Sequence, residues 1–245
     1  MERGVQINTT LLTTLALGFA LGIRHALDAD HVVAVSTIVS RYRQPFRAAV
    51  VGVLWGLGHT TTLFLAGTTV IVFKLAIPAG LALSMEFLVG IALFALGLQI
   101  LWEHRPKERH VHIHEHLGKA HAHEHAHRHM RAQDEIHHHN PTEHRSFILG
   151  MIHGLAGSGA LILVVLGGTR SLAEGIAYIL IFGLGSILGM AIVTTLIGLP
   201  FALSSRRLES LNRTIRLMAG ALSVALGFFI MFSVAIVQGL FHGIQ

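Results

Sequence analysis

Six apolar stretches dominate the sequence, and each is long enough to cross a lipid bilayer as a helix, which takes about 20 residues. They lie near residues 8–39, 46–73, 81–102, 146–168, 172–200 and 214–238. Hydrophobic residues make up 52% of the 245-residue chain and charged residues only 13%, a combination that soluble domains of this size rarely show. The sequence therefore predicts an all-α integral membrane protein with six transmembrane helices. We expect the first stretch to be retained, because it continues into further apolar sequence without a signal-peptide cleavage site.

Arginine residues gather in two of the short connections between these stretches: Arg41, Arg43, Arg47, Arg206, Arg207, Arg213 and Arg216. The positive-inside rule places these connections in the cytoplasm. With six spans, both termini then face outward, and the long connection over 104–145 faces the cytoplasm. Orientation in the bilayer thus accounts for the formal net charge of +5, and we expect the lipid bilayer, but no nucleic acid, as a partner.

The sequence lacks cysteine and a nucleotide-binding motif, and both absences limit the functions that the chain can have. The chain contains no cysteine, which excludes thiolate metal ligands and a thiol-transferring membrane protein of similar build. It also lacks the Gly-x-x-x-x-Gly-Lys-Ser/Thr motif of proteins that hydrolyse ATP. Transport by this chain would therefore draw on an ion gradient or on the membrane potential.

The second half of the chain repeats the first. The segments 21–27 and 149–155 align with a histidine in the same column, and Gly-Leu-Gly recurs at 56–58 and 183–185. The third and sixth stretches carry glycine pairs at matching positions: Gly90 with Gly97, and Gly220 with Gly227. Because each repeat holds three spans, the two halves insert with opposite topology, as in many secondary transporters. The predicted organisation is a 3+3 inverted repeat: a first three-helix repeat over 1–103, a His-rich loop over 104–145 and a second repeat over 146–245.

The first stretch carries five ionisable side chains within eight residues: Arg24, His25, Asp28, Asp30 and His31. A charge at the centre of a span costs about 2.5–3.5 kcal/mol even on insertion scales, so such residues are functional by default. On an uninterrupted helix His25, Asp28 and His31 share one face. Two imidazoles and a carboxylate suit nickel, cobalt or zinc and match magnesium or calcium poorly. Asp30 points elsewhere on such a helix and is a candidate to orient a ligating histidine.

Two further histidines lie in apolar stretches, His59 before three threonines and His153 in the fourth stretch. A lone buried histidine is more often a core residue than a ligand, but the small neighbours and the repeat make both of these candidates. The predicted metal-binding residues are therefore His25, Asp28, Asp30, His31, His59 and His153. No catalytic residue and no resident cofactor is expected, because the metal ion is the transported substrate.

The string Arg-His-Ala-Leu-Asp-Ala-Asp-His-Val at 24–32 closely resembles the signature of the nickel/cobalt permease family, a histidine followed after four residues by Asp-His. It also resembles the branch of that family found beside urease genes. The Leu-Gly-His-Thr string at 57–60 is similar to the family's Leu-Gly-His-Ser/Thr motif. The resemblance implies that His25, Asp30 and His31 are required for nickel recognition, with Asp28 and His59 accompanying them.

The second half departs from the family pattern. Family importers with eight spans look as though they carry an acidic motif of the type Phe-Asp-Thr-Ala-Thr-Glu in the span that corresponds to the fourth stretch. This chain has no carboxylate there, from His153 to Ala160. Either His153 compensates, or the first half holds most of the ion. A break of the helix near Gly157 and Gly159 would expose carbonyl oxygens to a cavity there.

Fourteen histidines fall within residues 104–144. Low hydrophobicity predicts that this loop is disordered without metal, and alternating histidines are typical of multivalent metal binding. We expect the loop to buffer cytoplasmic metal with little selectivity among nickel, cobalt, copper and zinc. The residues expected to do so are His112, His114, His116, His121, His123, His125, His127, His129, His137, His138 and His139. The loop also resembles those of nickel/cobalt efflux relatives.

These observations predict a secondary permease for nickel or cobalt in the cell membrane. A divalent ion gains about 4.6 kcal/mol per 100 mV on moving inward, and the first-span signature favours uptake, whereas the loop is compatible with export. Proteins that mature nickel enzymes are candidate partners.

An intramembrane zinc-dependent hydrolase is the alternative, with three of the histidines and an aspartate as zinc ligands and a water as nucleophile. The inverted repeat argues against it, because an enzyme has no need of two symmetric access routes.

Overall fold

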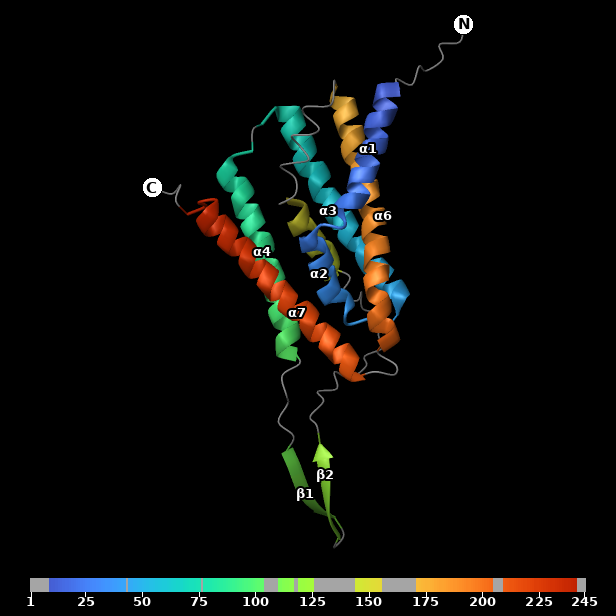
Figure 1. The fold of residues 1–245 in the computed structure, drawn as a ribbon, viewed down its shortest axis with the longest axis vertical. Coiled ribbons are helices and arrows are strands. Elements are labelled where there is room, and N and C mark those ends of the chain that lie inside the picture. The colour runs from blue at the N-terminus through green and yellow to red at the C-terminus, as the bar shows by residue number, and fades with distance from the viewer. Residues whose placement is uncertain are drawn as a thin grey trace.

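The computed structural model describes residues 9–42, 44–75, 77–103, 110–116, 119–125, 144–155, 171–204 and 209–241. Within these residues the chain is mainly helical (Figure 1). The helices are α1 (Thr9–His25), α2 (Ala29–Val39), α3 (Pro45–Phe73), α4 (Ala79–Glu103), α6 (Leu172–Ser204) and α7 (Glu209–Phe232), which continues into the π-helical turn η1 (Ser233–Val237). A further helix covers residues 144–155.

Among the described residues, four helices are long and apolar enough to cross a membrane: Pro45–Phe73, Ala79–Glu103, Leu172–Ser204 and Ser210–Val237. They correspond to the second, third, fifth and sixth predicted stretches. The pair α1 and α2 is a fifth span if it crosses as one bent unit. In the fourth predicted stretch the helix over 144–155 is described, whereas the remainder of that stretch, with Gly157 and Gly159, lies outside the described residues.

The first span is broken. Helix α1 ends at His25, α2 begins at Ala29, and the two are bent by 53° relative to one another. The N–H groups of Leu27 and Asp28 bond to carbonyls three residues earlier and close the end of α1. Asp28 then takes an extended conformation as the N-cap of α2, a position that aspartate favours. The shared face of His25, Asp28 and His31 was expected only for an uninterrupted helix, and because the helix is broken here that assignment does not apply.

Helices α1 and α6 cross at glycines that leave no room for a side chain. A Cβ at Gly22 would collide with the carbonyl oxygen of Phe182, and a Cβ at Gly185 would collide with that of Phe19. Each clash is with backbone, which no rotamer change relieves. Small residues at helix crossings let backbones approach closely, which is how helices pack in a lipid environment.

The same arrangement recurs between α3 and the helix over 144–155. A Cβ at Gly58 would collide with the carbonyl oxygen of Phe147, and a Cβ at Gly150 with that of Trp55. The first stretch of each half therefore packs on the second stretch of the other half.

Helices α4 and α7 form a third glycine crossing. Gly90 faces Gly227, and Gly97 faces Gly220. The buried hydroxyl of Ser223 donates a hydrogen bond of 2.8 Å to the carbonyl of Leu93 across this crossing. Figure 1 shows the α4–α7 pair on one side and α1, α3 and α6 on the other, with α2 between them. Helix α2 contacts α3, α4, α6 and α7.

Part of the His-rich loop is paired rather than disordered. Strand β1 (His110–His116) pairs antiparallel with β2 (Lys119–His125), and the register sets His112 opposite His123 and His114 opposite His121. The expectation of a disordered loop is wrong for these two strands, because a sequence alternating with period two matches the repeat of a β-strand. The loop histidines His104, His127, His129 and His137 to His139 lie outside the described residues.

Candidate metal site

The break in the first span brings two histidines together, and α3 adds a third. One ring nitrogen from each of His25, His31 and His59 lies within 4.8 Å of the other two. The ring centroids are 4.6 Å apart for His25 and His31, 5.0 Å for His25 and His59, and 5.2 Å for His31 and His59. Nitrogens bound to one ion at about 2.1 Å lie no more than about 4.2 Å apart. Small side-chain rotations therefore suffice for these three rings to share an ion.

Two of the three rings are sealed from the surface. His31 is 2% exposed and His59 is fully buried, whereas His25 is half-buried at the end of α1. The Nε2 atom of His31 and both ring nitrogens of His59 have no hydrogen-bond partner. Buried polar atoms are normally paired, and an exception needs an explanation such as an ion. These nitrogens are therefore positioned for a ligand that they do not find within the protein.

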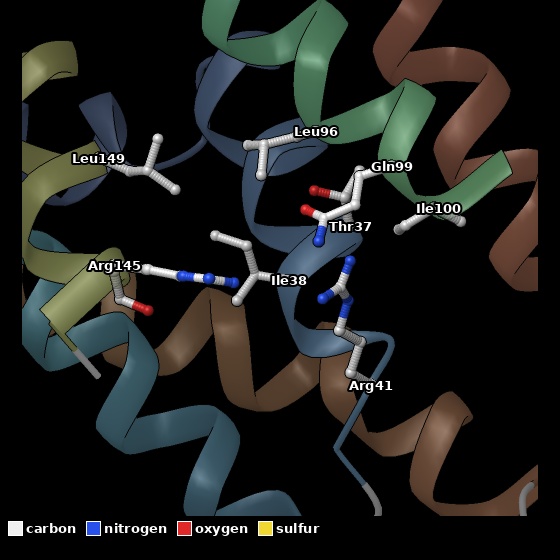
Figure 2. Close-up of a pocket in the computed structure, with 9 residues that line it drawn as sticks. Thr37, Ile38, Arg41, Leu96, Gln99, Ile100, Arg145 and Leu149 are labelled. Atoms are coloured by element: carbon white, nitrogen blue, oxygen red, sulfur yellow. The ribbon is translucent and has the colours of Figure 1, made fainter. Parts of the chain in front are cut away.

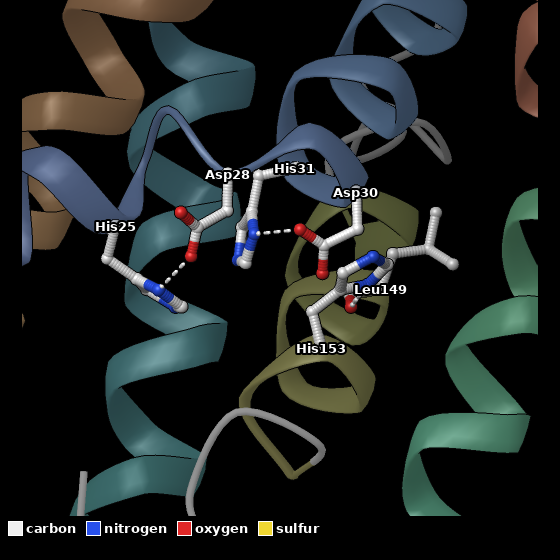
Figure 3. A network of polar contacts seen from close by, with 6 residues as sticks. All are labelled: His25, Asp28, Asp30, His31, Leu149 and His153. Atoms are coloured by element: carbon white, nitrogen blue, oxygen red, sulfur yellow. Dashed lines mark hydrogen bonds and ion pairs between the residues drawn. The ribbon is translucent and has the colours of Figure 1, made fainter. Parts of the chain in front are cut away.

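Each aspartate of the motif holds one ring of the group. The Nδ1 atom of His25 lies 2.7 Å from an Asp28 oxygen, and Nδ1 of His31 lies 3.1 Å from an Asp30 oxygen (Figure 3). Because an ionised carboxylate only accepts hydrogen bonds, these contacts place a proton on Nδ1 of both rings, and in the neutral imidazole Nε2 then carries a free lone pair. Carboxylates that hold a histidine this way orient the ring and raise its basicity as a metal ligand.

The six predicted residues lie near one another but do not all belong to the group of three nitrogens. His25, His31 and His59 come together, while Asp28 and Asp30 contact the rings of the first two. His153 lies outside the group of three nitrogens, but its ring centroid is 5.3 Å from that of His31.

Two aromatic neighbours of the group were missed from the sequence. Trp55 lies 4.7 Å from the His153 ring and 6.5 Å from the His31 ring, and Phe182 lies 5.6 Å from the His25 ring. Trp55 precedes His59 by four residues, so both lie on one face of α3, and this spacing could have identified it. Phe182 comes from α6, and no local signal connects it to His25.

We expect Asp28→Asn and Asp30→Asn each to weaken metal binding about 10–100-fold, the effect typical of losing a partner that orients a metal ligand. The asparagine keeps the size of the side chain but loses its charge. Binding is measured by titrating the purified protein with Co²⁺ and following the d–d absorption, in a background where the eleven predicted loop ligands are glutamine.

Glu174→Gln, at the start of α6, is the matched control for this charge removal. Equal affinities for the two aspartate variants and the control would show that the carboxylates do not position the rings.

The fold and the site define a multi-pass helical membrane protein with a group of three histidines inside its helix bundle. Residues 58–231 match the model of the family described as "Cytochrome C biogenesis protein transmembrane region". The urease accessory protein UreH of Bacillus sp. (strain TB-90) is 40% identical over 242 residues, covering 94% of this chain and 96% of that protein. A high-affinity nickel transport protein of Cupriavidus necator is 38% identical over 63 residues, covering 25% of this chain and 18% of that protein.

The chain therefore belongs to the nickel/cobalt permease family, in the branch of the UreH protein, and to the transmembrane-region family that its residues 58–231 match. No solved structure matches the chain significantly. Neither relative is named as a hydrolase, so the comparisons do not favour the zinc-dependent alternative.

Proposed function

We propose that this protein is a secondary permease that carries Ni²⁺, and also Co²⁺, across the cell membrane, and that His25, His31 and His59 hold the ion on its way. The observation that carries this proposal is the group of three ring nitrogens within 4.8 Å of one another, drawn from both sides of a broken span and from α3. Imidazole nitrogens suit nickel and cobalt, and two flanking carboxylates offset the charge of the ion.

The names of the relatives support the choice of metal. One is a urease accessory protein and the other a high-affinity nickel transport protein. Proteins that mature nickel enzymes are accordingly the partners we propose for the cytoplasmic side.

The architecture we propose is the 3+3 inverted repeat, with six spans divided into 1–103, the loop 104–145 and 146–245. The reciprocal glycine contacts support it. Exchanging the two halves converts the contact of Gly22 with Phe182 into that of Gly150 with Trp55, and converts the Gly90–Gly227 pair into the Gly220–Gly97 pair. Inverted repeats of this kind allow one site to open alternately to the two sides.

We propose uptake as the direction, with the His-rich loop in the cytoplasm and both termini outside. At 100 mV, inside negative, a divalent ion gains about 4.6 kcal/mol on entry. The loop histidines would then receive ions on the side where they are released, and so lower the free metal concentration there. Export through the same site would need a coupled step such as proton exchange.

Reconstituted liposomes with an internal metal-sensitive dye test the proposal. Under an imposed inside-negative potential of 100 mV, we expect Ni²⁺ to enter and to approach an accumulation of about 10³-fold, the ratio equivalent to 4.6 kcal/mol. Protein-free liposomes under the same potential are the control. Metal binding to the protein without flux in either direction, with or without a proton gradient, would contradict the permease function.

A further inference from the structure

A fourth imidazole, that of His153 from the second half of the chain, lies next to the three-histidine group, with its ring centroid 5.3 Å from that of His31. We propose that His153 and Asp30 form a second, weaker ion station, which an ion occupies between the three-histidine group and the loop-side end of the bundle. This inference rests on the proposed transport function and adds a residue from the second half to its path.

The hydrogen bonding of His153 prepares it to accept an ion. Its Nδ1 atom lies 3.1 Å from the carbonyl oxygen of Leu149, and because a carbonyl only accepts, the proton is on Nδ1. The Nε2 atom consequently carries a lone pair, and it has no partner although the side chain is only 1% exposed. An imidazole that merely fills space beside Trp55 would leave this buried polar atom without a hydrogen bond, which is energetically unfavourable.

Asp30 supplies the carboxylate of this station. One of its oxygens lies 3.1 Å from Nδ1 of His31, and the His31 ring centroid is 5.3 Å from that of His153. Figure 3 shows Asp30 between His31 and His153. The second half has no carboxylate of its own from His153 to Ala160, so Asp30 of the first half is the acid that remains for both stations.

Two protein ligands hold an ion less tightly than three imidazoles, and the remaining coordination positions are left to water. A site of that strength is useful in a transport path, because conduction requires sites that bind an ion well enough to admit it and weakly enough to release it. The two stations would therefore differ in role: the three-histidine group selects the ion, and His153 with Asp30 passes it on.

A separate pocket, shown in Figure 2, lies one helical turn from His153 and is lined by residues next to both ends of the His-rich loop. Leu149, whose carbonyl accepts the hydrogen bond from His153, also lines the pocket, together with Thr37 and Ile38 further along α2 from His31. At its other side lie Gln99 and Ile100 near the end of α4.

The pocket lies between the two roots of the loop. Arg41 lines it and pairs at 3.1 Å with Glu103, the last residue of α4, and Arg145 lines it from the start of the helix over 144–155. The helix that precedes the loop and the helix that follows it thus both line the pocket. An ion that leaves the second station along the pocket reaches the segment that carries the loop histidines.

Two substitutions at one position test the station. His153→Gln removes the imidazole, and His153→Phe keeps a ring against Trp55 but has no ligand atom, so it separates metal binding from packing. Both are made in the background with glutamine at the eleven loop positions, and His144→Gln at the exposed start of the same helix is the control. Co²⁺ affinity is measured by absorption, and Ni²⁺ flux is measured in liposomes.

We expect both His153 variants to keep the Co²⁺ affinity of their parent within about threefold, while Ni²⁺ flux falls about tenfold or more, the loss equivalent to one interaction with a charged group. Flux at the parental level in both variants would show that His153 is only a core residue, and affinity falling by the same factor as flux would place His153 in the first site. Either result overturns the second station. Absence of flux in the parent protein is instead the failure of the proposed function itself.

Discussion

Liposomes containing the His31→Ala or the His59→Ala protein are expected to show no more Ni²⁺ entry than protein-free liposomes. Both side chains are buried, and each supplies one of the three nitrogens that lie within 4.8 Å of one another. Alanine leaves two ligands, so metal affinity should fall by more than the 10–100-fold seen when only an orienting partner of a ligand is lost. Flux under an inside-negative potential and Co²⁺ affinity are the two measurements.

His144→Ala is the control for these variants, because it removes an exposed histidine at the start of the helix over 144–155. Size-exclusion profiles in detergent establish that the variants are folded. Folded variants that retain both the affinity and the flux of the parent would exclude the three-histidine group as the ion site.

Gly185→Ala is expected to lower the thermal stability of the detergent-solubilised protein severely, whereas Gly80→Ala leaves it unchanged or raises it. A Cβ at Gly185 meets the backbone of α1 at Phe19, so the helices must move apart; overpacking of this kind costs about 1–3 kcal/mol and sometimes more. Gly80 lies in the first turn of α4, where a Cβ meets nothing within 4 Å, and alanine has a higher helix propensity than glycine.

Because both substitutions replace glycine with alanine, a difference between their effects on thermal stability reports the surroundings of the two positions. The midpoint of thermal unfolding, followed by loss of the monodisperse peak, is the measurement. Equal midpoints for the two variants would show that the α1–α6 crossing tolerates a wider separation than the structure gives it.

Hydropathy predicted the long helices well because a lipid-exposed span needs a continuous run of apolar residues. The predicted stretch 46–73 matches α3 at Pro45–Phe73, and 172–200 matches α6 at Leu172–Ser204 to within a few residues. The bend after His25 was not predicted, because the apolar run continues on both sides of it. The available signal was Asp28, a residue type that favours the N-cap of a new helix.

The sequence indicated which residues to consider for the site, but not which of them lie next to one another. Charged and imidazole groups inside an apolar stretch indicate a functional region whatever the backbone does, so the three histidines that the structure brings together were among the predicted residues. Which of them meet depends on the 53° bend and on where α3 lies, and neither follows from the spacing of residues within one helix. The contact of His153 with Trp55 is likewise set by the glycine crossing of Gly150 on α3, a tertiary feature.

Because of the bend, the ring nitrogens of His25, His31 and His59 come from three different helices, α1, α2 and α3, each packed against its own neighbours. His25 ends a helix held against α6, whereas His31 belongs to α2, which contacts α4 and α7 as well. The separation of the nitrogens therefore varies with the angle of the joint at Asp28, and an ion that draws them together fixes that angle. By thermodynamic reciprocity, any change that biases the angle alters the affinity for ions of one radius relative to another. Under the proposed function, residues at the α1–α6 crossing that touch no metal ligand would therefore influence which metal ion the site prefers.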